Sequence, residues 1–279
     1  MGLPPVVLLH GMWSTGRSLD SVRFALEARG YPVFAPTLPL HPAHGPEELA
    51  ALGRLSLLDY ARYLEDALLN ARLPAPPVFI GHSMGGLLAQ ILAARTAARA
   101  CVLLAPAPPA GINVVRPCNL WSTRNVLATP AFWRKPQIPT DSIADAALFR
   151  EIAPERRSTL RSALLHESGR VYAEIVFWWA DAARASAVDA ESVQCPMLVV
   201  SGDRDRIIPC SVARRVADRY PAAEFLALPG RGHWLFEEPG ADEVFARVGS
   251  WLDLVCAVTD ERGAPRQPAA SPVAAVASL

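Results

Sequence analysis

Residues 76–86 read Pro-Pro-Val-Phe-Ile-Gly-His-Ser-Met-Gly-Gly, and this stretch decides the fold. A short apolar run leads to a serine with a glycine two positions away on either side, and a helical pattern follows directly. This G-x-S-x-G spacing between a strand and a helix is typical of a sharp turn that presents a serine hydroxyl above a sheet. Side chains at the two glycine positions would collide with the neighbouring backbone. The stretch therefore predicts that Ser83 is a nucleophile.

The rest of the chain alternates between short apolar runs and helical patterns, which is typical of parallel sheets covered by helices. Strands are predicted at Val6–His10, Val33–Pro36, Pro77–Gly81, Ala100–Ala105, Met197–Ser201 and Glu224–Leu228. Helices are predicted at about Leu19–Arg29, Leu57–Ala71, Met84–Ala98, Cys210–Tyr220 and Pro239–Val255. The predicted fold class is α/β, with a mostly parallel, doubly wound sheet.

One interval interrupts this alternation. No strand is predicted from about Pro108 to Ser192, and the interval carries helical patterns, prolines and four of the seven tryptophans, namely Trp121, Trp133, Trp178 and Trp179. We interpret residues 109–192 as a helical cap inserted between two strands of a core domain made of residues 1–108 and 193–256. Residues 257–279 are rich in Ala and Pro and predict a disordered tail.

The composition narrows the class of partner. The 279 residues include 27 basic and 27 acidic side chains, a balance that argues against binding to nucleic acid through excess positive charge. Five widely spaced cysteines without a C-x-x-C pattern predict neither a disulfide framework nor a zinc site. The first residues lack a secretory signal pattern, and no apolar run reaches the roughly 20 residues of a membrane span. We expect a cytoplasmic protein with a small-molecule substrate and no membrane insertion, metal or cofactor.

A serine nucleophile needs a base and a group that orients the base. The predicted strand that ends near Ser201 runs into Asp203 and Asp205, and a glycine-flanked His233 follows the last predicted strand. Both loops come at the carboxyl ends of strands, which is where ligands bind in open α/β sheets.

This order of serine, aspartate and histidine resembles the α/β-hydrolase fold family over about residues 5–255. The resemblance implies that Ser83 is the nucleophile, that His233 is the general base and then the general acid, and that Asp205 orients the imidazole. The family places its acid a few residues before a proline, here Pro209, which favours Asp205 and leaves Asp203 as a turn residue.

The first predicted strand ends in Leu-Leu-His-Gly-Met-Trp at residues 8–13, and its Gly11 allows the chain to turn towards the same edge of the sheet. The family draws oxyanion donors from this loop and from the residue after the nucleophile. The resemblance thus implies that the backbone amides of Met12 and Met84 form an oxyanion hole. The aromatic side chains of residues 109–192 either form the core of the cap itself or face an apolar substrate pocket. Our candidates for the lining of such a pocket are Trp13, Trp178, Trp179 and Trp234.

Other histidines are interpreted as structural. His82, beside the nucleophile, is expected to pack or to form a hydrogen bond, and His41 and His44 lack a third residue that would complete a metal site. The polar stretch at residues 166–168 is interpreted as a solvated helix end.

Serine at the turn favours acyl chemistry, because relatives that open epoxides or displace halide use aspartate and dienelactone-type relatives use cysteine. We expect hydrolysis of a small to medium apolar carboxylic ester, of the carboxylesterase or monoacylglycerol-lipase type, through an acyl-enzyme. Lactones, thioesters and carbon–carbon bonds are alternative substrates for the same residues, and cofactor-free haloperoxidase activity ranks third. A non-catalytic ligand-binding protein is the alternative of another class.

Overall fold

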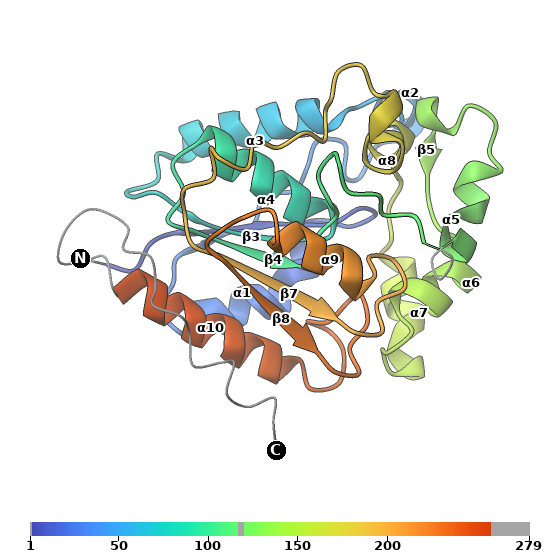
Figure 1. Ribbon diagram of the computed structural model, residues 1–279. Helices are drawn as coiled ribbons and strands as arrows, with labels where there is room; N and C mark the ends of the chain where they lie inside the picture. The colour runs from blue at the N-terminus through green and yellow to red at the C-terminus, as the bar shows by residue number, and fades with distance from the viewer. Residues whose placement is uncertain (1, 117–119, 258–279) are drawn as a thin grey trace.

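A six-stranded sheet forms the centre of the protein, and all of its neighbouring strands run parallel. The computed structural model describes residues 2–116 and 120–257 (Figure 1). The strand order is β2-β1-β3-β4-β7-β8. The strands span Val6–Leu9 (β1), Val33–Phe34 (β2), Val78–His82 (β3), Ala100–Leu104 (β4), Met197–Gly202 (β7) and Ala223–Leu228 (β8). Each of them lies within one residue of a predicted strand or inside it, so the α/β class is confirmed.

Side chains that alternate along each strand build two separate apolar cores. Val7 and Leu9 point to the core that also contains residues of helices α3, α4 and α9, whereas Val6 and Leu8 point to the core of α1 and α10. These helices span Asp20–Glu27 (α1), Leu57–Ala71 (α3), Met84–Arg95 (α4), Cys210–Ala217 (α9) and Ala241–Ala257 (α10). Figure 1 shows α1 and α10 on the opposite side of the sheet from α3. The sheet is therefore doubly wound.

The helix α2 (Gly45–Leu52) was not predicted. It follows a loop of prolines and histidines, and Pro46 occupies its first turn, where a missing amide hydrogen costs no helical bond. In the sequence, the prolines of the preceding loop argued against a helix. The helix itself contains proline only in its first turn, where proline is tolerated. A short 3₁₀ helix, η1 (Gly16–Leu19), precedes α1.

Residues 105–196, which we call the inserted segment, connect β4 to β7. Figure 1 shows this segment at the end of the sheet to which the strands point. It contains α5 (Leu120–Leu127), η2 (Phe132–Arg134), β5 (Pro136–Gln137), α6 (Asp141–Ile143), the π-helical turn η3 (Ala144–Leu148), α7 (Pro154–Ser162), β6 (Glu167–Ser168), α8 (Gly169–Val176) and η4 (Trp178–Ala180). The antiparallel pair of β5 and β6 was not predicted, because strands of two residues carry no periodic pattern.

The structure bears only in part on the predicted tail, the cysteines and the expected absence of a membrane span. The predicted disordered tail, apart from Ala257, lies outside the described residues, and so does Cys118. None of the helices in the described part of the chain is both long enough and apolar enough to cross a bilayer.

Candidate active site

Ser83 occupies the sharp turn between β3 and α4 with φ 53° and ψ −119°, a left-handed conformation that is unusual for a residue with a side chain. Its N–H donates to the carbonyl of Leu104 at 3.0 Å, and its carbonyl accepts from the N–H of Ala107 at 2.8 Å. The backbone packs so closely that a Cβ on Gly81 would lie 2.1 Å from the carbonyl oxygen of Gly85. The glycines on either side of the serine therefore make this turn sterically possible.

A buried aspartate–histidine pair lies in the two loops that follow β7 and β8. Nδ1 of His233 lies 2.7 Å from Oδ2 of Asp205, and the two residues are only 2% and 5% exposed. The other oxygen, Oδ1 of Asp205, accepts from the N–H groups of Ile207 and Ile208 at 2.7 and 2.9 Å. The carboxylate fixes the proton on Nδ1, so Nε2 of His233 is left as the nitrogen that can accept a proton.

The neighbouring Asp203 has a different environment. Its Oδ1 accepts from the N–H of Gly230 at 2.8 Å and so closes the turn between the two loops. This position agrees with its interpretation as a turn residue.

His82 connects the serine turn to the histidine loop. Its Nε2 donates to the carbonyl oxygen of His233 at 2.9 Å, and the two imidazole rings lie 4.8 Å apart. Burial and the neighbouring His233 hold the pKa of His82 well below its ordinary value, so its imidazole is neutral. Through this bond the residue before Ser83 is tied to the backbone of His233.

The loop after β1 approaches the serine turn from the other side. A Cβ built on Gly11 would lie 3.1 Å from Cβ of Ser83, which measures how close the two loops are. Among the hydrogen bonds of the described residues, none is donated by the backbone N–H of Met12 or Met84. Met84 is also the first residue of α4, where amides are unpaired and the helix dipole favours negative charge.

His10 holds this loop in place. Its Nδ1 donates to the carbonyl of Gly11 at 2.8 Å, and its Nε2 accepts from the N–H of Leu38 at 3.0 Å. Burial and the nearby His41 lower the pKa of His10 to about 4, which keeps the imidazole neutral. A neutral ring is required here, because a protonated Nε2 could not accept the amide of Leu38.

A small apolar cavity of about 70 Å³ lies next to Ser83. The β1 loop, the serine turn, the inserted segment and the loop after Asp205 all contribute to its lining, which is Met12, Trp13, Ser83, Met84, Ala107, Val114, Val115, Ser122, Asn125, Val126, Pro139, Tyr172, Ile175, Val176, Ile207 and Ile208. Cavities that hold small-molecule ligands usually measure about 300–1,000 Å³. The inserted segment therefore packs closely on this site and leaves less space beside Ser83 than such cavities usually have.

Trp13 and Asn125 each bring to this cavity a buried polar atom that has no hydrogen-bond partner among the described residues. These atoms are Nε1 of Trp13, a donor, and Oδ1 of Asn125, an acceptor. Buried polar groups normally form hydrogen bonds. A donor and an acceptor without partners at one apolar cavity are therefore candidates for contact with a ligand. Sequence analysis missed Asn125, because nothing in the pattern of α5 distinguishes it from a surface residue.

The four predicted pocket tryptophans are separated by the structure. Trp13 lines the cavity of Ser83, whereas Trp178, Trp179 and Trp234 are not among the residues that line it. Trp234 is 4% exposed and packs 5.1 Å from Phe149 in the core, and Trp179 is 58% exposed. The side chain of Trp121 lies outside the description.

The expectation of a solvated helix end at residues 166–168 is wrong. Glu167 and Ser168 form β6 and are fully buried, and the Glu167 carboxylate accepts from the hydroxyl of Tyr60 at 2.6 Å and faces Nε2 of His41. Sequence reasoning failed because the partners come from segments more than 100 residues away. In the described part of the chain, no group of three or more His, Cys, Asp or Glu residues is placed to hold a metal ion.

Residues 6–247 match the sequence pattern of the family described as the Alpha/beta hydrolase family, and the chain belongs to that family. It is similar to a monoacylglycerol lipase of Mycolicibacterium smegmatis, with 29% identity over 259 residues that cover 88% of this chain and 87% of that protein. The solved monoacylglycerol lipase of Paleococcus ferrophilus superposes with a TM-score of 0.66 at 20% identity, covering 91% of this chain and 97% of that one. A methylesterase from Arabidopsis superposes with a TM-score of 0.68 at 13% identity, covering 90% and 100%.

Proposed function

We propose that this protein hydrolyses carboxylic esters through an acyl-enzyme formed on Ser83. The observation that carries the proposal is the buried pair of His233 and Asp205. The carbonyl of His233 accepts a hydrogen bond from His82, which precedes Ser83, and Ser83 has a strained backbone with a positive φ. The similarity to a monoacylglycerol lipase over most of both chains supports an ester as the substrate.

The proposed mechanism assigns one task to each group. Oγ of Ser83 attacks the ester carbonyl while Nε2 of His233 takes its proton, and the Asp205 carboxylate stabilises the imidazolium that results. The amides of Met12 and Met84 stabilise the negative oxygen of the tetrahedral intermediate. The imidazolium returns its proton to the leaving alcohol, and the same imidazole then activates the water that releases the acid.

The cavity favours one type of ester. Its lining is mostly aliphatic, which suits a small to medium apolar acyl group. The N–H of Trp13 and the Oδ1 of Asn125 provide one donor and one acceptor at the cavity, and a hydroxyl group can both accept and donate a hydrogen bond. We therefore propose an ester that carries a free hydroxyl near the scissile bond, as a monoacylglycerol does.

Covalent labelling with a fluorophosphonate tests the nucleophile directly. The folded protein is expected to be labelled at Ser83, as located by peptide mass spectrometry, and Ser83→Ala is expected to lose both the label and ester hydrolysis with its thermal midpoint retained. Absence of label on folded protein would favour a non-catalytic ligand-binding protein. A substantial hydrolysis rate in Ser83→Ala would overturn the assignment of this residue.

The same catalytic groups can act on lactones, thioesters or carbon–carbon bonds. A panel of p-nitrophenyl esters of increasing chain length, monoacylglycerols, thioesters and lactones separates these substrates by kcat/KM. We expect the monoacylglycerols to give the highest value.

A further inference from the structure

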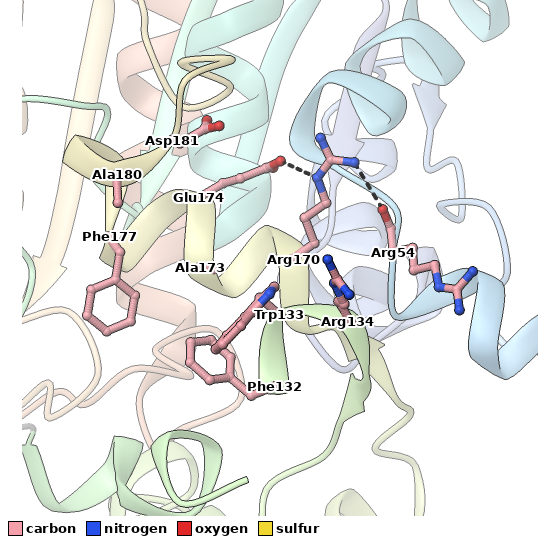
Figure 2. A pocket seen from close by; sticks show the side chains of 10 residues that line it. All are labelled: Arg54, Phe132, Trp133, Arg134, Arg170, Ala173, Glu174, Phe177, Ala180 and Asp181. Carbon is pink, nitrogen blue, oxygen red and sulfur yellow. Dashed lines mark hydrogen bonds and ion pairs between the residues drawn. The ribbon is translucent and has the colours of Figure 1, made fainter. Parts of the chain in front are cut away.

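A second and larger hollow of about 930 Å³ lies on the outer side of helix α8 (Figure 2). Three arginines and three aromatic residues are prominent in its lining, which includes Arg54, Arg134, Arg170, Phe132, Trp133 and Phe177. In the view of Figure 2 the arginines lie on one side and the rings of Phe132 and Phe177 on the other. The hollow thus has a cationic part and an apolar part.

Helix α8 separates this hollow from the cavity of Ser83. Tyr172, Ile175 and Val176 line the Ser83 cavity, whereas Arg170 and Ala173 line the outer hollow. This division follows from helical geometry, in which residues three and four positions apart share a face. The two cavities have no lining residue in common, so the outer hollow is a distinct site.

The apolar part is a cluster of aromatic rings. The ring of Phe132 lies 5.3 Å from that of Trp133 and 6.1 Å from that of Phe177, measured between centroids. Trp133 is 49% exposed although it is a large apolar side chain. A hydrocarbon chain laid on these rings would remove apolar surface from water, which is favourable.

The cationic part is only partly neutralised within the protein. Nε of Arg170 donates to Oε1 of Glu174 at 2.9 Å, and its Nη1 contacts the carbonyl of Arg54 at 3.5 Å. The guanidinium groups of Arg54 and Arg134 form no hydrogen bond and no ion pair with any residue that the structure describes. Two planar groups that suit carboxylates therefore lie at one hollow, and no acidic side chain of the described residues pairs with either.

The acidic residues at the hollow are already occupied. Oε2 of Glu174 accepts from the N–H of Leu57 at 2.8 Å, and burial raises the pKa of Glu174 to about 7. The carboxylate of Asp181 accepts from the N–H groups of Ala183 and Ala185. Neither carboxylate is bonded to Arg134, and the three arginines of the lining outnumber its two carboxylates, so the hollow keeps a net positive charge.

We propose that this hollow binds a medium-chain carboxylate, with the carboxylate on Arg134, whose guanidinium has no partner among the described residues, and the hydrocarbon chain on Phe132, Trp133 and Phe177. The planar guanidinium favours a carboxylate, and the adjacent rings favour a ligand with an apolar tail over a small inorganic anion. The acid released by the proposed ester hydrolysis has this chemistry, but binding in the hollow does not require that reaction.

Isothermal titration calorimetry with octanoate, acetate and octan-1-ol tests both parts of the site. Octanoate is expected to bind the full-length protein more tightly than acetate, which lacks the tail, and than octan-1-ol, which lacks the charge. Arg134→Gln is expected to weaken octanoate binding by about tenfold or more, because a charge-assisted hydrogen bond is lost. The side chain of Arg134 is exposed and forms no ion pair with the part of the chain that the structure describes, so the variant is expected to keep its thermal midpoint.

Lys135→Gln is the matched control, because Lys135 is an exposed cation next to Arg134 that does not line the hollow. Its octanoate affinity is expected to stay within about twofold of the wild type, since an exposed charge that does not line the hollow is screened by salt. Equal affinities in the wild type and Arg134→Gln would overturn the proposal, because any octanoate that binds would then not contact Arg134. An equal loss in both variants would also overturn it, since that outcome indicates attraction by overall charge.

Discussion

The carboxylate of Glu167 lies 3.2 Å from Nε2 of His41, and both side chains are completely buried. The other ring nitrogen, Nδ1, faces the carbonyl oxygen of Pro39 at 2.9 Å. A carbonyl and a carboxylate can only accept, so the imidazole carries a proton on each nitrogen and the pair is ionic. It joins the inserted segment to the loop before α2, close to His10 and the loop that contains Met12.

Replacement of Glu167 with Gln is expected to destabilise the protein by about 3–5 kcal/mol, because it leaves His41 buried without its counter-charge. Urea unfolding at neutral pH measures this loss. Tyr60→Phe removes a hydrogen bond to the same carboxylate but keeps the ion pair, and we expect a smaller loss of about 1–2 kcal/mol. A larger loss in Tyr60→Phe than in Glu167→Gln would contradict the ionic interpretation.

The same pair predicts a loss of stability at alkaline pH. Burial opposes both charges, but the hydrogen bond and charge of Glu167 raise the pKa of His41, and those of His41 lower the pKa of Glu167. A raised histidine pKa gives stabilisation that is complete below the unfolded pKa of about 6.5 and is lost as pH rises through the folded pKa. The lowered carboxyl pKa gives stabilisation that is lost only as pH falls through the folded pKa of Glu167.

We therefore expect the difference in unfolding free energy between the wild type and Glu167→Gln to shrink as the pH is raised from about 6 to 9. Urea titrations of both proteins at each pH cancel the contribution of groups that titrate alike in the two. Tyr60 stays protonated over this range, because burial and Glu167 raise its pKa well above the ordinary value of a tyrosine. A difference that stayed constant over this range would show that His41 is not charged in the folded protein at pH 6.

Asp205→Asn is expected to lower kcat by about 10⁴-fold with little change in the fold, because an amide no longer fixes the proton on Nδ1 of His233. Ester hydrolysis and circular dichroism give the two measurements. Asp203→Asn serves as the matched control, since this carboxylate closes a turn and does not contact His233. If the two variants were equally active, Asp205 would have no role in orienting the histidine.

Gly85→Ala is expected to destabilise the protein by about 1–3 kcal/mol or more, although alanine is the better helix former at a position inside α4. A Cβ at this position would lie 2.0 Å from the carbonyl oxygen of Leu9, so β1 or α4 has to shift. Thermal unfolding measures the effect. Gly2→Ala, where nothing lies within 4 Å of the added atom, is expected to leave the midpoint unchanged.

Trp13→Phe tests whether the unpaired indole N–H contacts the substrate. For a monoacylglycerol we expect kcat/KM to fall by about tenfold, since one hydrogen bond is lost, whereas a p-nitrophenyl ester without a hydroxyl is expected to change little. Trp178→Phe is the control, because its indole N–H is also buried without a partner in the described ranges, 2–116 and 120–257, but Trp178 does not line the Ser83 cavity. A similar loss for both esters would indicate that Trp13 only shapes the cavity.

The sequence by itself determined the central sheet and the order of its helices, because strands and helices of this fold are encoded by local apolar patterns and by turn residues. The stretch around Ser83 is the clearest case, since strand, glycine, serine and helix all lie within eleven residues. Asp205 and His233 followed from their position at strand ends, and the structure places them in contact.

Only the tertiary structure decided which side chains meet across the inserted segment. Glu167 looked like a surface residue because its partners, His41 and Tyr60, are more than 100 positions away. From the sequence, Trp13 and Trp234 were equally good candidates for the lining of the pocket. In the structure Trp13 lines the cavity, whereas Trp234 packs in the core. Packing of this kind depends on the direction of each side chain and on distant neighbours, and neither is written in a local pattern.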